Sequence, residues 1–268
     1  MPLADLEVHG RTFAVTGSAS GIGDAVARRL NAAGADVVSL DIRAPDAPVD
    51  QHIPCDLSDP GAIDAAVDAI EGELGGLCNV AGVPGTQSAE LVFAVNFLGL
   101  RYLTEALLPR IAPGGAVVNV ASTAGWEWNT RLPLILEALA TSSFEEGRAW
   151  LEEHAPDDLA PYHFSKELVT VYTMAASLRA ARHGVRINAV SPGPVQTPIL
   201  PDFEESMGKE LLDGVKAIVG RHGTPADIAP LVVFLLSPAT GWVNGENLVA
   251  DGGAVAAVVS GVAAVPAS

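Results

Sequence analysis

The sequence of 268 residues predicts an α/β fold with one doubly wound parallel sheet of about seven strands. Short runs rich in β-branched residues alternate with longer segments of helical period along the whole chain. The strand runs are apolar throughout and do not alternate with polar residues, which is typical of strands covered by helices on both faces. No internal repeat and no low-complexity linker divides the chain, so we expect a single domain over residues 1–268.

The predicted strands and helices follow one another in regular alternation. Strands are expected at 11–16, 35–41, 51–55, 76–80, 115–121, 185–190 and 246–250. Helices are expected at 21–33, 60–71, 88–110, 161–183, 203–219 and 225–236. Two helices carry clear end signals, because Gly184 follows one as a C-terminal cap and Pro225 occupies the first turn of another.

One connection is much longer than the others. About forty residues separate the strand 115–121 from the helix 161–183, far more than an ordinary strand-to-helix loop. We expect a helical insertion over 126–161 on the substrate side of the fold. Pro133 followed by LILEALA predicts one short helix, and Ser143, followed three residues later by Glu, predicts a capping box that starts a second.

Composition argues against several classes of function. The formal net charge of −17, from 15 basic and 32 acidic residues, disfavours nucleic acid and anionic membrane surfaces as partners. The segment MPLADLEVHG lacks the pattern of a secretion signal, and no stretch reaches the length of an apolar membrane span. Cys55 and Cys78 are too few for a disulfide framework and have no histidine at metal spacing. We expect a cytoplasmic protein with two buried thiols and no metal site.

A glycine-rich turn joins the first predicted strand directly to a helix. It has the sequence Thr16-Gly17-Ser18-Ala19-Ser20-Gly21-Ile22-Gly23. Glycines at such a turn allow the backbone to approach a pyrophosphate, whose charge is stabilised by the free N–H groups of the helix N-terminus. No Gly-Lys-Ser/Thr follows, so the pattern is not that of a P-loop. A plain connection is the alternative, but the position between strand and helix favours dinucleotide binding.

Asp41 closes the second predicted strand, 18 positions beyond Gly23. A carboxylate there accepts hydrogen bonds from the adenosine ribose hydroxyls and repels a 2′-phosphate, which favours NAD over NADP. A solvated aspartate at a strand end is the alternative interpretation. Arg43 argues the other way, because a guanidinium can stack on adenine or pair with a 2′-phosphate. The glycine-rich turn supplies no second basic group, so NAD is the preferred cofactor.

Tyr162 and Lys166 are separated by about one helical turn, which places a phenol and an ammonium on the same helix face. A free tyrosine has a pKa of about 10, and a neighbouring ammonium stabilises the phenolate enough to help proton transfer near neutral pH. Alone, such a pair is most often a surface contact. Ser122, just after a buried strand, would likewise normally be a turn or cap residue.

Together these residues resemble the short-chain dehydrogenase/reductase family, which has a single-domain Rossmann-type fold. The matching motifs occur in the family's order along nearly the whole chain. They are the turn from Thr16 to Gly23, Cys55-Asp56-Leu57, Asn79-Val80-Ala81-Gly82, Asn96 in VNFLG, Ser122 in NVAS, Tyr162 with Lys166, and Ser191-Pro-Gly-Pro-Val-Gln-Thr197. The departure is Val80, where the family has a second asparagine.

The resemblance implies a role for each matched residue. Tyr162 would be the general acid/base, and Ser122 would hydrogen-bond the reacting oxygen. Lys166 would lower the pKa of Tyr162 and hold the nicotinamide ribose, and Asn96 would position a water. The implied NAD site consists of Gly17, Ser20, Gly21, Ile22, Gly23, Asp41, Ile42, Asp56, Leu57, Asn79, Ala81, Gly82, Tyr162, Lys166, Pro192, Gly193, Val195 and Thr197.

The lengthened insertion resembles that of the bacterial 3α-hydroxysteroid dehydrogenase/carbonyl reductase branch, and the coniferyl-alcohol dehydrogenase branch has nearly the same pattern. Trp126 and Trp128 follow Ser122 so closely that we expect them to face the nicotinamide pocket as a flat apolar wall. The expected substrate is the secondary alcohol or ketone of a hydrophobic cyclic molecule, steroid- or terpenoid-like. A primary aromatic alcohol is the alternative substrate, and a catalytically silent NAD-binding regulator is the alternative of another class.

The insertion also bears on assembly. Family members commonly pair through the helices that correspond to 88–110 and 161–183. Two extra helices just before Tyr162 would cover that surface and leave the last helix and strand for pairing. We expect a homodimer, with a tetramer as the alternative. His154 and His163 are expected to be solvated.

Overall fold

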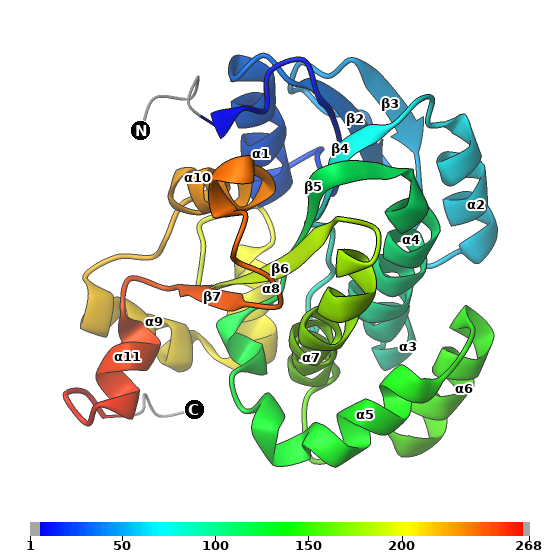
Figure 1. Cartoon of the computed structure of the whole chain (residues 1–268). Coiled ribbons are helices and arrows are strands. Elements are labelled where there is room, and N and C mark those ends of the chain that lie inside the picture. The colour runs from blue at the N-terminus through cyan, green and yellow to red at the C-terminus, as the bar shows by residue number, and fades with distance from the viewer. Residues whose placement is uncertain (1–5, 265–268) are drawn as a thin grey trace.

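The computed structural model describes residues 6–264, and within them seven parallel strands form one sheet with helices on both faces (Figure 1). The strands are β1 (Thr12–Thr16), β2 (Asp36–Asp41), β3 (Gln51–Pro54), β4 (Leu74–Asn79), β5 (Ile111–Val120), β6 (Arg186–Pro192) and β7 (Asn247–Ala250). Their order is β3-β2-β1-β4-β5-β6-β7, and every neighbouring pair is parallel. The predicted fold class is confirmed. The strand order reverses between β1 and β4, which opens a crevice at their carboxyl ends.

The helices lie in two layers. They are α1 (Gly21–Ala32), α2 (Pro60–Ala69), α3 (Ala89–Phe93), α4 (Leu100–Leu107), α5 (Leu132–Ala140), α6 (Phe144–His154), α7 (Pro161–Ala181), α8 (Leu200–Met207), α9 (Lys209–Val219), α10 (Pro225–Leu236) and α11 (Ala254–Val259). One hydrophobic core lies between the sheet and the pair α1 and α10. The other lies between the sheet and α2, α4 and α7. Burial on both faces explains why the strands are apolar throughout.

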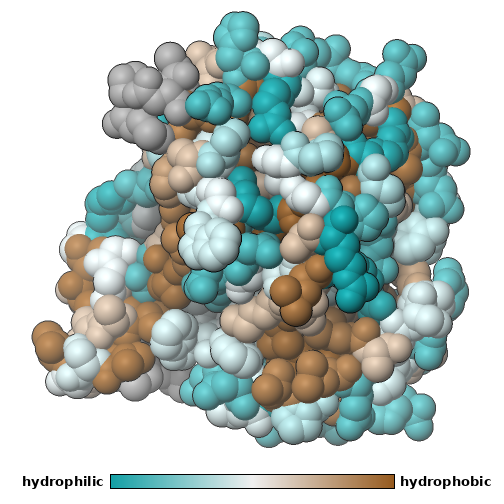
Figure 2. Space-filling model, in the orientation of Figure 1, coloured by the Kyte–Doolittle hydropathy of each residue, from teal (hydrophilic) through white to brown (hydrophobic). Residues whose placement is uncertain are grey.

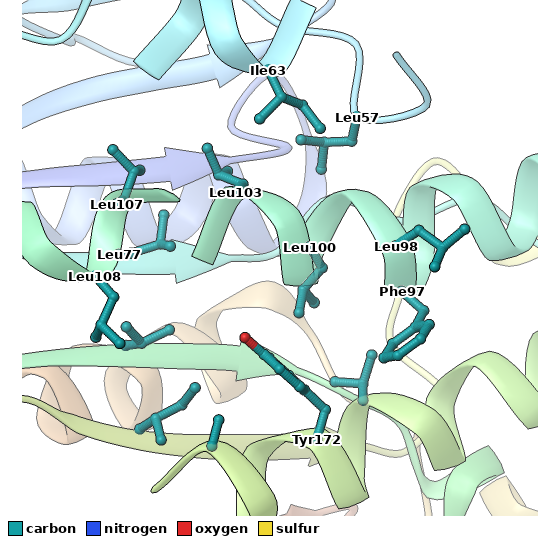
Figure 3. Close-up of a cluster of buried hydrophobic side chains, with 14 of the residues drawn as sticks. Leu57, Ile63, Leu77, Phe97, Leu98, Leu100, Leu103, Leu107, Leu108 and Tyr172 are labelled. Carbon is teal, nitrogen blue, oxygen red and sulfur yellow. The ribbon is translucent and has the colours of Figure 1, made fainter. Parts of the chain in front are cut away.

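Helix α4 illustrates how helical period builds the second core. Leu100, Leu103 and Leu107 recur at intervals of three and four residues and are all buried. Figure 3 shows them in a buried cluster with Leu77 of β4 and Tyr172 of α7. This packing fixes α7, and with it the side chains of the active site, against the sheet.

Two predicted helices differ from expectation. The run 88–110 is helical throughout but contains a π-helical turn, Ala94–Gly99, between α3 and α4. The prediction of one helix over 203–219 was wrong. The chain forms α8 and α9 instead, separated at Gly208, whose φ of +91° is incompatible with a continuing helix. Helix α11 was not predicted.

The helical insertion is present as predicted, with α5 and α6 beside α7 and α3 (Figure 1). The Ser143 hydroxyl accepts a hydrogen bond of 3.1 Å from the backbone N–H of Glu146. The other half of the capping box is displaced by one residue, because the Glu146 carboxylate accepts from Ser142 and not from Ser143. The second helix therefore starts where the sequence predicts.

The helical run Ala89–Arg110 is long and apolar enough to cross a membrane, but 72% of its most apolar 18-residue window is buried in the fold. It is therefore a core element. Figure 2 shows a largely polar surface on the visible face, with apolar residues gathered over the lower part of the molecule. Cys55 and Cys78 are both buried free thiols, as predicted, and burial raises the pKa of Cys55 to about 11.

Candidate active site

A cavity of about 610 Å³ lies along the carboxyl ends of the strands, where the strand order reverses. Most residues of the predicted cofactor and catalytic sets line it, although they come from segments far apart in the sequence. They are Gly17, Ser20, Gly21, Ile22, Gly23, Asp41, Ile42, Asp56, Leu57, Ala81, Gly82, Ser122, Tyr162, Lys166, Pro192, Gly193, Val195 and Thr197. Asn79 and Asn96 do not line the cavity.

The glycine-rich turn is packed too tightly for side chains. A Cβ on Gly17 would lie 2.7 Å from the Cα of Ala81, and one on Gly23 would lie 2.1 Å from the Gly17 carbonyl oxygen. Ser20 stands at the N-cap of α1 without a side-chain hydrogen bond to the helix, which leaves the first N–H groups of α1 available to an anion. The cradle fits the pyrophosphate of a dinucleotide.

The departure from the family pattern at Val80 leaves this cradle intact. The backbone N–H groups of Val80 and Ala81 donate to the Thr16 hydroxyl, at 2.9 and 3.0 Å. These bonds join the end of β4 to the end of β1 without using the side chain at position 80. A valine there is compatible with the turn for that reason.

Asp41 is held in place at the adenosine end of the cavity. Its Oδ2 accepts from the Ala19 N–H at 2.9 Å, and its Oδ1 accepts from the Arg43 N–H at 3.0 Å. The carboxylate has lone pairs left for ribose hydroxyls. Ile42, 68% exposed, and Asp56 line the cavity nearby. The residues at this end fit an adenosine.

Ser122, Tyr162 and Lys166 converge at the other end of the cavity. Tyr162 and Lys166 lie in the first turns of α7 and are only 8% and 4% exposed. The Lys166 Nζ lies 5.6 Å from the centre of the Tyr162 ring and donates to the Val120 carbonyl at 3.0 Å. Ser122 follows β5, where its hydroxyl accepts from the Ala124 N–H at 3.1 Å.

Burial governs the electrostatics of these groups. It raises the pKa of Tyr162 to about 12, while hydrogen bonding with Ser122 acts in the opposite direction. It also lowers the pKa of Lys166 to about 8. The expected lowering of the Tyr162 pKa by Lys166 is thus not found in the protein alone, because removal from water raises this pKa and the hydrogen bond with Ser122 is what opposes the rise.

Asn96 lies in the π-helical turn, behind Gly82 of the cavity wall. Its Oδ1 accepts from the Val83 N–H at 2.8 Å, and its Nδ2 donates to the Val83 carbonyl at 3.1 Å and to the Ser165 hydroxyl at 3.2 Å. The amide therefore fixes the loop after β4 against α7, the helix that carries Tyr162 and Lys166. Its predicted role toward a water stays a prediction.

Asn79 is buried between β5 and α4 and does not line the cavity, so its predicted cofactor contact stays a prediction. Its Nδ2 donates to the Thr104 hydroxyl and to the Asn119 Oδ1, both at 2.8 Å. Asn119 in turn donates to the Thr173 hydroxyl at 2.9 Å. These bonds join two strands to α4 and α7, so the side chain supports the sheet beneath the cavity.

The prediction that Trp126 and Trp128 face the nicotinamide pocket was wrong. Neither lines the cavity. Trp126 is 45% exposed, and Trp128 packs against the core on the insertion side. The reason is Gly125, which is packed so closely on α7 that a Cβ would lie 2.6 Å from the Lys166 carbonyl carbon. The chain after Ser122 thus runs along α7 and away from the cavity.

The two histidines behave differently. His154 is exposed, as predicted, and its ring stacks on Trp150. His163 is only partly solvated, in contrast to the prediction: the residue is half-buried, and its Nδ1 is buried without a hydrogen-bond partner among residues 6–264. Burial lowers the pKa of His163.

The residues that line the substrate side of the cavity were not predicted from the sequence. They are Val83, Leu91, Val95, Thr123, Ile199, Leu200, Asp202, Phe203, Met207 and Leu212. The Phe203 ring lies 4.9 Å from the Tyr162 ring, centre to centre, at an angle of 56°. The sequence could have indicated the residues of α8, because this helix starts shortly after the carboxyl end of β6, at the edge of the sheet where the cavity lies.

A family model described as short chain dehydrogenase matches residues 11–133, and one described as enoyl-(acyl carrier protein) reductase matches residues 140–255. The coniferyl-alcohol dehydrogenase of Pseudomonas sp. (strain HR199 / DSM 7063) is 39% identical over 92% of this chain and 98% of its own length. The chain is a short-chain dehydrogenase/reductase. Members of this family are oxidoreductases that bind a nicotinamide cofactor.

Two further relatives have similar coverage. The 3-alpha-hydroxysteroid dehydrogenase/carbonyl reductase of Comamonas testosteroni is 33% identical over 89% of this chain and 94% of its own. The structure of the 3-alpha-hydroxysteroid dehydrogenase from Pseudomonas sp. B-0831, complexed with NADH, matches with a TM-score of 0.80 and 32% identity, over 94% of this chain and 99% of that one. Both branches that the insertion resembles are thus among the relatives of this short-chain dehydrogenase/reductase.

Proposed function

We propose that this short-chain dehydrogenase/reductase is an NAD-dependent dehydrogenase of primary aromatic alcohols. The observation that carries the proposal is the convergence of Ser122, Tyr162 and Lys166 at a cavity whose substrate side is mostly apolar. The persistence of all three residues argues against a catalytically silent NAD-binding regulator. The preference for NAD rests on the fixed carboxylate of Asp41.

One comparison favours an aromatic alcohol over the steroid- or terpenoid-like cyclic alcohol. The relative that acts on coniferyl alcohol is more similar, at 39% identity against 33% for the hydroxysteroid dehydrogenase/carbonyl reductase. The flat wall expected from Trp126 and Trp128 is absent from the cavity, and because such a wall suits steroid, terpenoid and aryl alcohols alike, its absence does not distinguish them. The secondary alcohol or ketone of a hydrophobic cyclic molecule is the second candidate, supported by the 0.80 TM-score of the hydroxysteroid dehydrogenase.

The side chains divide the chemistry among them. Tyr162 takes the hydroxyl proton of the alcohol at its Oη and returns it to the carbonyl oxygen in the reverse direction. Ser122 donates a hydrogen bond to the same oxygen and stabilises charge that develops there. Lys166, with a pKa of about 8, is mainly protonated at neutral pH and favours the phenolate of Tyr162. A bound nicotinamide supplies the hydride acceptor, which no side chain can replace.

We further propose a cytoplasmic homodimer. The two buried free thiols are compatible with a reducing compartment. The insertion packs on α3 and α7 and covers part of the surface through which the family commonly pairs. β7 is the last strand of the sheet on its side and remains available for pairing.

The proposal is tested by following NADH formation with a panel of aryl, terpenoid and steroid alcohols, each in parallel with NADP. We expect turnover with NAD and a primary aromatic alcohol, at a kcat/KM at least tenfold above that for any steroid. Tyr162→Phe is expected to abolish turnover while NADH binding stays within a factor of about two. Turnover of steroids alone would favour the second candidate, a dehydrogenase of a hydrophobic cyclic alcohol. If the protein binds NAD but turns over no alcohol, the result would support a catalytically silent NAD-binding regulator.

A further inference from the structure

The substrate side of the cavity carries one ionisable side chain besides Tyr162 and Lys166. It is Asp202, in the first turn of α8 and next in sequence to Phe203, whose ring packs against Tyr162. The Asp202 carboxylate makes no hydrogen bond and no ion pair with the residues that the structure describes. Its neighbours on this side of the cavity are almost all apolar. They are Val83, Leu91, Val95, Ile199, Leu200, Phe203, Met207 and Leu212.

The positive groups of the cavity lie elsewhere. Arg43 is at the adenosine end, where its backbone is bonded to Asp41. Lys166 donates to the Val120 carbonyl and is committed to Tyr162 and the cofactor ribose in the proposed mechanism. Among residues 6–264, no cationic side chain lines the substrate side, and Asp202 is the charged group of this part of the chain that a substrate anion would meet there. The net charge of −17 adds a repulsive field of the same sign.

We propose that Asp202 is a specificity-determining residue that excludes anionic substrates and admits neutral ones. The inference rests on the proposed function and narrows its substrate class to aromatic alcohols without a carboxylate, sulfonate or phosphate. A carboxylate in an apolar wall repels a like charge strongly, because the low-dielectric surroundings screen the repulsion poorly. The same carboxylate accepts a hydrogen bond from a phenol or second hydroxyl on the substrate ring.

A purely structural role for Asp202 predicts something different. An aspartate in the first turn of a helix stabilises the N-terminus through the helix dipole. Its loss would then weaken α8 and affect neutral and anionic ligands alike. Glu205 provides the matched control, since it lies on the same helix, is exposed and does not line the cavity. Asp202→Asn and Glu205→Gln remove the same charge from α8 at two different places.

The experiment compares two ligands of nearly equal shape, 4-(hydroxymethyl)benzamide and 4-(hydroxymethyl)benzoate. Their dissociation constants are measured by calorimetry with NADH present, and their kcat/KM values with NAD. We expect the wild-type protein and Glu205→Gln to prefer the amide at least tenfold in both measurements. In Asp202→Asn the preference falls to within about threefold, mainly because the benzoate binds more tightly. Unchanged NADH affinity shows that each variant is folded.

The outcomes separate this inference from the proposed function. Preferential binding of the amide without its oxidation overturns the function and keeps the charge discrimination. Oxidation of both compounds with similar kcat/KM keeps the function and overturns the role of Asp202. That role is also overturned if Asp202→Asn retains the tenfold preference, if Glu205→Gln loses it, or if neither compound binds.

Discussion

Glu167 of α7 and Arg131 of the insertion form an ion pair one residue beyond Lys166. The Arg131 Nε donates to the Glu167 Oε2 at 2.8 Å, and the Arg131 Nη2 contacts the other oxygen. The Glu167 side chain is only 1% exposed. The insertion is thus held by a two-point contact to the helix that carries Tyr162 and Lys166. We expect the stability of the protein to depend strongly on this contact.

Replacement of Arg131 by Met should destabilise the protein by about 3 to 5 kcal/mol, because it leaves the Glu167 carboxylate buried without a partner. The free energy of unfolding in urea measures the loss. Arg148→Met is the control, since Arg148 pairs with Glu90 at the surface and its loss should cost no more than about 1 kcal/mol. Equal losses of unfolding free energy in the two variants would show that the Glu167 carboxylate is not shielded from water.

The burial of Lys166 predicts how stability depends on pH. Its pKa is about 8 in the folded protein, against 10.5 for a free lysine, so the unfolded chain binds more protons between these values. Lys166 by itself therefore contributes a rise in stability of about 2 kcal/mol from pH 7 to 9.5. Cys55 and Cys78, whose pKa values burial raises, act in the opposite direction above about pH 8.5, and Tyr162, with its pKa raised to about 12, does so above about pH 10.

The comparison with Lys166→Met isolates this contribution, since all other groups titrate in both proteins. The difference in unfolding free energy, variant minus wild type, should shrink by about 2 kcal/mol between pH 7 and 9.5. NADH must be absent from both samples. A constant difference over this range would mean that Lys166 keeps an ordinary pKa in the folded state.

Coenzyme preference offers a test of the adenosine end of the cavity. The Asp41 carboxylate is fixed by the Ala19 and Arg43 N–H groups, where it would repel a 2′-phosphate. Asp41→Ala should lower the ratio of kcat/KM for NAD to that for NADP by about tenfold to a hundredfold. Arg43→Ala is the companion variant. If Asp41→Ala leaves the ratio unchanged while Arg43→Ala alters it, the arginine sets the preference.

The parts of the site that could be predicted are those fixed by strand ends and helical period. Gly17 and Ser122 follow strands and Asp41 ends one, and the carboxyl ends of parallel strands meet at one edge of a sheet. Tyr162 and Lys166 meet because they are about one helical turn apart. These relationships are local or topological, so the sequence alone contains them.

The orientation of the remaining side chains depends on tertiary packing, which no local pattern encodes. Asn79 lies at the end of a strand, as its motif predicts. Its side chain, however, lies in a buried hydrogen-bond network with Thr104 and Asn119. His163 is adjacent to Tyr162 but is half-buried, with its Nδ1 removed from water. The path of the chain after Ser122 is set by the close contact of Gly125 with α7, which became visible only in the structure.

That path leads to a kinetic prediction about the aromatic residues near the site. Phe203 packs against the Tyr162 ring and lines the cavity, whereas Trp126 is partly exposed and does not. Phe203→Ala should lower kcat/KM for an aromatic alcohol by about tenfold or more, because the substrate loses an apolar surface beside the reacting oxygen. Trp126→Ala should leave kcat/KM within about twofold. Steady-state kinetics with NAD at saturation measures both. A large loss in Trp126→Ala with none in Phe203→Ala would contradict this prediction. It would mean that Trp126 of the insertion contacts the substrate and that the chain after Ser122 follows a different path.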